Sequence, residues 1–116
     1  MPRRKSNFDR QDIPSIEQIR ELFAPVLRDG GAKRAIVFGS YARGEADLHS
    51  DLDLIIVTDT ALKFTRRHEQ FIGIDEIWQK GLDMLIYTPQ ELAELLSKGR
   101  AFVERALDEG VVIYEE

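Results

Sequence analysis

The sequence predicts a single soluble domain with an α/β or α+β fold, and three observations support the parts of this prediction. Short apolar runs of strand length alternate with segments of helical periodicity. The length of 116 residues fits one domain. The composition, 43% hydrophobic and 32% charged, is typical of a soluble globular protein. We therefore expect a single domain over residues 14–116, preceded by a flexible arm over the polar residues 1–13.

The first half of the domain should begin with a helix over residues 15–28. Its apolar residues fall on one face, and Ser15 and Gln18 have the spacing of a capping box. Pro25 should kink this helix or end it early. A turn at 30–31 should lead into a short buried strand at 34–38, a short helix at 40–46, a loop at 46–50 and a second strand at 51–57.

The second half should contain a helix over about 65–80, with Trp78 in the core and Gly81 as its stop. Gly73 weakens that helix. The remaining elements should be a strand at 82–87, a helix that starts at Thr88-Pro89-Gln90-Glu91 with a capping box, a helix at about 100–109 ended by Gly110, and a strand at 111–114.

Charge and composition exclude several classes of function. A net charge of −5 and a pI near 5.1 disfavour a nucleic-acid binder, which needs a basic face. Without cysteines there is no disulfide or thiolate site, and only His49 and His68 offer imidazole. A metal site would consist mainly of carboxylates, which favour magnesium or manganese. The thin core of so short a chain leaves room for stabilisation by a partner or by self-association.

The sequence shows neither a signal peptide nor a membrane span. The basic cluster at residues 3–5 is not followed by an apolar run, and no stretch approaches the roughly 18 apolar residues that a membrane span needs. We therefore expect a cytoplasmic location and no membrane partner.

Two aspartates carry the first chemical signal. Alternation along a strand places Asp51 and Asp53 on one face. Neighbouring carboxylates repel each other, and a divalent cation between them removes that conflict. By itself the pair also fits a solvated strand start. A third carboxylate, Asp83, lies within the apolar run 82–87, where a buried charge is costly unless it is paired or metal-bound. Three carboxylates on neighbouring strands suit a two-metal site for phosphoryl transfer.

Gly39-Ser40 carries the second signal. This pair follows an apolar strand and precedes a short helix, so free backbone N–H groups and the Ser40 hydroxyl could meet an anion. Glycine lets phosphate oxygens approach the backbone. The pair is common in strand-to-helix turns, and it matches neither a P-loop nor a dinucleotide fingerprint. A phosphate-holding turn and a set of metal-binding carboxylates are complementary parts of one site.

Together these residues resemble the DNA polymerase beta-like nucleotidyltransferase superfamily, in particular its minimal nucleotidyltransferase (MNT) branch. The resemblance covers Gly39-Ser40-Tyr41-Ala42-Arg43-Gly44, Ser50-Asp51-Leu52-Asp53 and Asp83, within a core from about Arg34 to Tyr87. It implies a short mixed sheet flanked by helices and two magnesium ions.

The same resemblance implies a role for each motif residue. Asp51 and Asp53 would ligate both ions, and Asp83 would ligate the catalytic ion and help activate the attacking hydroxyl. Gly39 and Ser40 would hold the β- and γ-phosphates.

Other residues remain open at this stage. Arg43 could reach a phosphate or pair with Glu45 or Asp47 on the surface. The cluster of Lys63, Arg66 and Arg67 could face a triphosphate or lie at a solvated helix start. Tyr41 could stack on a base or pack in the core. The two histidines should lie in a loop and on a helix surface.

Two functions compete. The first is a magnesium-dependent enzyme that transfers a nucleoside monophosphate, AMP from ATP being favoured, to a hydroxyl group. Minimal members of the family resemble antitoxins that act on HEPN toxins, so a HEPN-type helical protein is the expected acceptor. The second is a module that binds a nucleotide or a HEPN-type partner without turnover. An antibiotic nucleotidyltransferase is disfavoured because such enzymes usually carry an additional domain.

Overall fold

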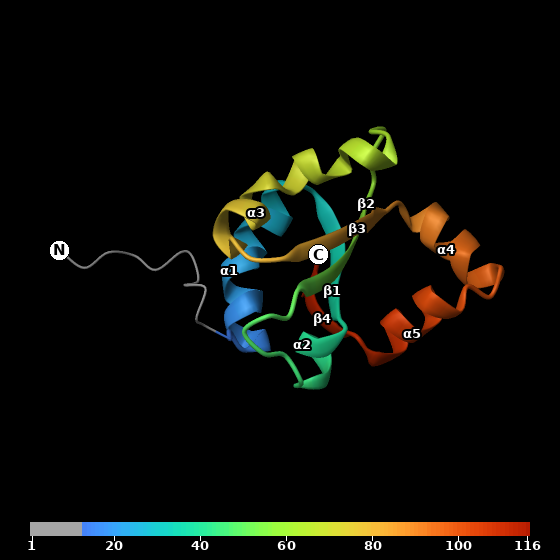
Figure 1. Cartoon of the computed structure of the whole chain (residues 1–116). Helices are drawn as coiled ribbons and strands as arrows, with labels where there is room; N and C mark the ends of the chain where they lie inside the picture. Colours follow the sequence, from blue (N-terminus) through green and yellow to red (C-terminus); the bar gives the residue numbers. More distant parts are fainter. Residues whose placement is uncertain (1–12) are drawn as a thin grey trace.

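The computed structural model describes residues 13–116, and these form one mixed sheet between two layers of helices (Figure 1). The strands are β1 (Ala32–Phe38), β2 (Leu52–Thr58), β3 (Leu82–Tyr87) and β4 (Val111–Glu115), in the spatial order β3-β2-β1-β4. β1 pairs antiparallel with β2 and β4, whereas β2 and β3 are parallel. The predicted fold class is therefore confirmed. The predicted arm lies almost entirely outside the described residues, so the domain boundary stays a prediction.

Helix α1 (Ile16–Asp29) forms the centre of one layer. Its capping box is present, with the Gln18 N–H donating to Ser15 Oγ and the Ser15 N–H donating to Gln18 Oε1. Three residues of its apolar face are fully buried and three are partly buried against the same core, namely Ile19, Phe23 and Leu27, and Ile16, Leu22 and Val26. The helix continues through Pro25 to Asp29, so the expected early end is wrong. Burial of Phe23 and Leu27 on either side of Pro25 outweighs the hydrogen bond that proline removes.

The expected single helix at about 65–80 is two elements. A 3-10 helix, η1 (Phe64–Phe71), precedes α3 (Ile72–Trp78). Arg67 and Phe71 are both buried in η1, and α3 begins at the residue after Phe71. The stop is also different, because Gln79 adopts the left-handed conformation at the C-cap, two residues before Gly81. Trp78 is fully buried, as predicted.

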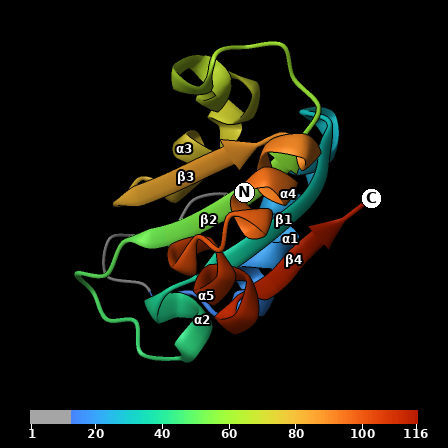
Figure 2. The ribbon, with the colours of Figure 1, turned by 90° about the vertical axis from the view of Figure 1, so that its right-hand side faces the viewer.

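Helices α4 (Pro89–Ser97) and α5 (Ala101–Glu109) cover the other face of the sheet, opposite α1 and α3 (Figure 2). The predicted capping box at Thr88 and Glu91 is present. Alternate residues of the central strands divide between the two layers. Leu52, Leu54 and Ile56 of β2 pack toward α1 and α3, and Ile55 and Val57 pack toward α4 and α5. No helix within residues 13–116 is long and apolar enough to cross a membrane.

The topology brings four chain segments to one end of the sheet. β2 and β3 start there, antiparallel β1 ends there, and β4 starts beside the end of β1. The short helix α2 (Ser40–Arg43) follows β1 directly and ends at Gly44 in the left-handed conformation. This helix is shorter than the predicted 40–46. The motif residues at 39–40, 51, 53 and 83 all lie at or next to this end of the sheet.

Candidate active site

Asp53 and Asp83 are partners in the parallel register of β2 and β3. Asp53 is two residues before Ile55, and Asp83 is two residues before Leu85. Both apolar residues pack in the core under α4 and α5. Because side chains alternate along a strand, both carboxylates point to that same face. Two strands that are 30 residues apart in sequence thus place their acidic groups side by side.

Asp83 differs in one respect from the expectation. It is the second residue of β3, an edge strand, and its side chain is exposed rather than buried in the middle of an apolar run. The cost of burying a charge therefore does not explain this residue. Its register position opposite Asp53 distinguishes it from an ordinary exposed carboxylate.

Asp51 lies just before β2, against the turn that precedes β3. Gly81 is so close that a Cβ atom there would collide with the Asp51 carboxylate. Two hydrogen bonds to the Gly81 carbonyl hold this turn, one from the Leu52 N–H at 2.9 Å and one from Trp78 Nε1 at 3.0 Å. The absence of a side chain at Gly81 therefore lets the fixed backbone and the carboxylate lie together.

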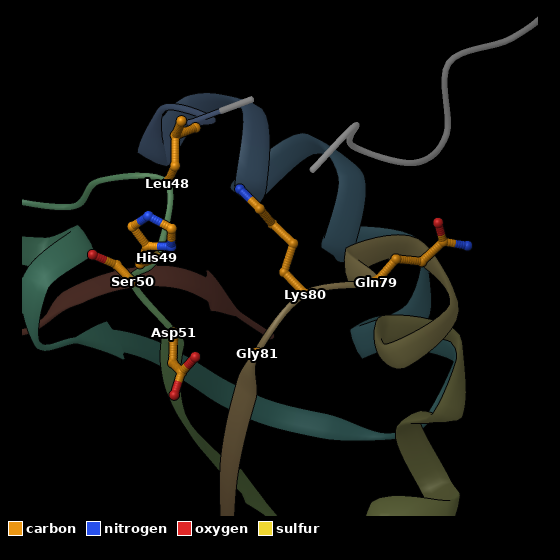
Figure 3. A pocket seen from close by; sticks show the side chains of 7 residues that line it. All are labelled: Leu48, His49, Ser50, Asp51, Gln79, Lys80 and Gly81. Carbon is orange, nitrogen blue, oxygen red and sulfur yellow. The ribbon is translucent and has the colours of Figure 1, made fainter. Parts of the chain in front are cut away.

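A pocket of about 350 Å³ opens beside Asp51 (Figure 3). In the close-up the Asp51 carboxylate lies below the His49 ring, and Lys80 extends from the facing turn. The predicted loop position of His49 is confirmed, since it is exposed between α2 and β2. The lining residues are Leu48, His49, Ser50, Asp51, Gln79, Lys80 and Gly81.

Gly39 connects the end of β1 to α2 with φ 76° and ψ −151°, a conformation that side chains with a Cβ rarely adopt. A Cβ atom on Gly39 would collide with Oδ2 of Asp53. The Gly39 carbonyl accepts from the N–H groups of Ala42 and Arg43, which closes the turn. The Gly-Ser turn and the Asp53 carboxylate are therefore in direct contact, and they belong to one site.

Charges of like sign converge on Asp53. Burial raises the pKa of the Asp53 carboxyl, the negative charges of Asp83 and Asp51 raise this pKa further, and Arg43 opposes them. A hard divalent cation would relieve this repulsion, and oxygen ligands suit it. Across residues 13–116, however, no three acidic or histidine side chains are gathered closely enough to ligate one ion. Metal binding would therefore have to draw the three carboxylates closer together.

Arg43 forms ion pairs at the edge of this site. Its guanidinium lies 2.9 Å from Glu45 and 3.5 Å from Glu109 of α5. The surface pair with Glu45 that the sequence left open is present. Arg43 also acts electrostatically on Asp53, which places its charge near the carboxylates. Its contact with a phosphate stays a prediction.

Two residues of the basic cluster after β2, Arg66 and Arg67, form ion pairs away from the site. Arg67 is buried, and its guanidinium donates to the Ile86 carbonyl and forms a two-pronged pair with Glu91. Ile86 lies near the end of β3, whereas Asp83 lies near its start. Arg66 pairs with Glu69 on the η1 surface. The alternative that this cluster faces a triphosphate is therefore wrong for Arg67, which joins η1 to α4.

Tyr41 packs in the core and is 5% exposed, with its ring edge-on to Trp78 at 5.5 Å. Of the two alternatives for Tyr41, packing in the core is therefore confirmed, and stacking on a base is wrong. Tyr41 is buried because α2 follows β1 directly and packs against the end of the sheet. His68 is exposed on η1, as expected.

Two features of the site were not predicted from the sequence. The first is the close contact of Gly81 with Asp51, since the sequence predicted Gly81 only as a helix stop. A parallel pairing of Asp53 with Asp83 would also have placed residue 81 beside residue 51. The second feature is a pocket between α2 and α5, in which Phe102 and Arg105 take part. No sequence motif marks α5, so this pocket depends on the packing of distant elements.

Similar folds are found among solved structures. A structure described as a "putative minimal nucleotidyltransferase" superposes with a TM-score of 0.61 at 25% identity, covering 84% of this chain and 95% of that one. A toxin-antitoxin crystal structure with AMP-PNP superposes with a TM-score of 0.59 at 19% identity, covering 79% of this chain and 69% of that one. The fold is thus that of the minimal nucleotidyltransferases.

The family follows from the sequence comparisons. Residues 18–113 match the model of the nucleotidyltransferase domain. A Methanocaldococcus jannaschii protein named "putative protein adenylyltransferase" is 32% identical over 73 residues, which cover 63% of this chain and 78% of that protein. The chain belongs to the nucleotidyltransferase domain family, and it is a nucleotidyltransferase.

Proposed function

We propose that this chain transfers AMP from ATP, with magnesium, to a hydroxyl group on a partner protein. One arrangement carries the proposal: Asp53 and Asp83 are register partners, and Gly39 of the Gly-Ser turn touches Asp53. Phosphate-binding and metal-binding groups therefore meet within one small volume, as a two-metal phosphoryl transfer requires.

Each residue of the site has a role in this proposal. Gly39 and Ser40 hold the β- and γ-phosphates through backbone N–H groups and the Ser40 hydroxyl. Asp51, Asp53 and Asp83 would hold two magnesium ions, which when bound neutralise phosphate charge and polarise the reacting oxygens. Asp83 takes the proton of the acceptor hydroxyl while the oxygen of that hydroxyl attacks the α-phosphorus. The bond from that phosphorus to the bridging oxygen breaks, and pyrophosphate leaves.

A protein acceptor is favoured over a nucleic acid. The net charge of −5 is unsuited to phosphate-backbone binding. The archaeal relative bears the name of a protein adenylyltransferase, and structural neighbours are toxin-antitoxin complexes. Together with the family resemblance, these similarities support a HEPN-type helical protein as partner and an antitoxin role for this chain.

Co-expression with a HEPN-type helical protein tests this function. We expect a stable complex, and ATP with magnesium should add the mass of one or more AMP groups to the partner. Intact mass spectrometry and transfer of label from α-labelled ATP provide the measurements. A stable complex that gains no mass would support the module that binds without turnover. Absence of any complex would remove both partner-based functions.

A further inference from the structure

A second pocket lies next to the Gly-Ser turn, on the face of the sheet that carries α5. Its volume is about 200 Å³. It starts at Gly39 and Arg43 and extends over the end of β1 to α5, which lies beside α2 in Figure 2. A nucleotide with its phosphates on the Gly39 turn would therefore have this pocket within reach. The lining residues are Phe38, Gly39, Arg43, Phe102, Arg105, Ala106 and Glu109.

Phe102 gives this pocket an aromatic wall. Its side chain is 56% exposed, although its ring packs edge-on against Phe38 at 5.7 Å between centroids. Phe38 is itself nearly buried and is the register partner of Asp53. The exposed ring is thus fixed by a residue of the same site. An aromatic ring held in place with its surface open suits stacking with a planar ring.

Polar groups surround this aromatic wall. Arg105 lies one turn after Phe102 on α5 and forms no ion pair within the described part of the chain. Glu109 lies one turn further along α5 and forms an ion pair with Arg43 across the pocket. A cation and a carboxylate can recognise the ring nitrogens and exocyclic amine of a base, which an aliphatic ligand lacks.

We propose that this pocket binds the base of the nucleoside triphosphate, with Phe102 as the stacking residue. This base site rests on the proposed nucleotide-transfer function and adds the position of the base to it. The phosphates lie on the Gly39 turn, and the base lies between Phe102 and the arginine side chains. The pocket beside Asp51 is then left to the acceptor.

Binding measurements on the intact chain test this assignment. Calorimetry would compare ATP with inorganic tripolyphosphate, each with magnesium, for wild type and Phe102→Ala. Loss of one stacked base should weaken ATP binding by about tenfold, whereas tripolyphosphate binding should stay unchanged. Phe102→Tyr, which keeps the ring, should bind ATP like wild type.

Phe64→Ala is the matched control. Phe64 is 49% exposed and also packs on one aromatic ring, that of Tyr87, at the opposite end of β3 from Asp83. Its removal should leave ATP affinity unchanged. Equal ATP affinity in wild type and Phe102→Ala would overturn the base site alone, and so would an equal loss of ATP and tripolyphosphate binding in a folded Phe102→Ala. A wild type that binds neither compound would overturn the proposed function as well.

Discussion

Gly39 lies directly against the carboxylate of Asp53, with no room between them for a side chain on Gly39. The contact joins the strand-to-helix turn to the central strand of the sheet. It also fixes the distance between the two parts of the site that the sequence predicted separately. Any group larger than hydrogen at position 39 must therefore displace the carboxylate, the turn or both.

Gly39→Ala should abolish most transfer activity. The added methyl group meets Asp53 and forces a backbone conformation that costs about 1–3 kcal/mol of folding free energy. Displacing a catalytic group by about 1 Å costs on the order of 100-fold in rate. Gly44→Ala is the control, because Gly44 also has a positive φ of 74° but has open space around it. It should lose stability and keep its activity, as label transfer and thermal unfolding would show. Equal activity in both variants would contradict a specific role for Gly39.

Gly81→Ala should raise the magnesium concentration needed for half-maximal activity. The methyl group would push the Asp51 carboxylate away from its place, while the backbone bonds from Leu52 and Trp78 resist any movement of the turn. Titration of label transfer with magnesium would measure the shift. Gly99→Ala is the comparison, since no atom lies within 4 Å of a Cβ atom there. An unchanged magnesium requirement in Gly81→Ala would mean that the position of Asp51 does not matter.

Asp53→Asn should abolish label transfer and yet raise thermal stability in the absence of divalent metal. The pKa of Asp53 is raised in the folded state, which means that folding disfavours the ionised carboxylate. The free energy of unfolding is therefore lowered whenever this group is charged. The neutral amide should therefore raise the melting temperature on the order of a few degrees at pH 7. The difference should shrink as the pH falls and Asp53 of the wild type becomes protonated. Transfer activity that survives in this variant would count against the proposed site.

Glu91→Gln should destabilise the protein in a pH-dependent manner. Arg67 foremost, and the Thr88 backbone N–H, lower the pKa of Glu91 to about 2. The ionised carboxylate thus adds stability that is fully present above about pH 4.5 and is lost as the pH falls toward about 2. The loss at pH 7 should be about 1 kcal/mol, because the Glu91 side chain is 42% exposed and solvent screens the pair.

Glutamine can still form the capping box, so Glu91→Gln isolates the charge. Denaturant unfolding at several pH values would follow the difference from wild type. Glu94→Gln on the same helix is the control, because Glu94 is exposed and forms no ion pair with the residues that the structure describes. It should show no pH-dependent difference. A Glu91→Gln effect that stays constant from pH 7 to about pH 2 would rule out the charge as its origin.

Local sequence signals determined most of the elements. The capping boxes at Ser15 and Thr88, the β-branched strand after Asp51 and the stop at Gly110 act within a few residues, so the chain itself specifies them. Where burial competed with a local signal, the local signal failed. Helix α1 runs through Pro25, because Phe23 and Leu27 on either side of it are buried. Helical periodicity over 65–80 did not show that this segment divides into η1 and α3.

The sequence by itself also indicated the Gly-Ser turn and the acidic pair as candidate site residues, because these motifs have a characteristic spacing along the chain. Only the tertiary structure decided how they meet. The parallel register sets Asp83 beside Asp53, and close packing leaves no room for a Cβ at Gly39 or Gly81. The tertiary structure also places Phe102 in a pocket with Gly39, and it places Arg67 against the far end of β3. Such placements depend on contacts between residues far apart in sequence, which no local pattern encodes.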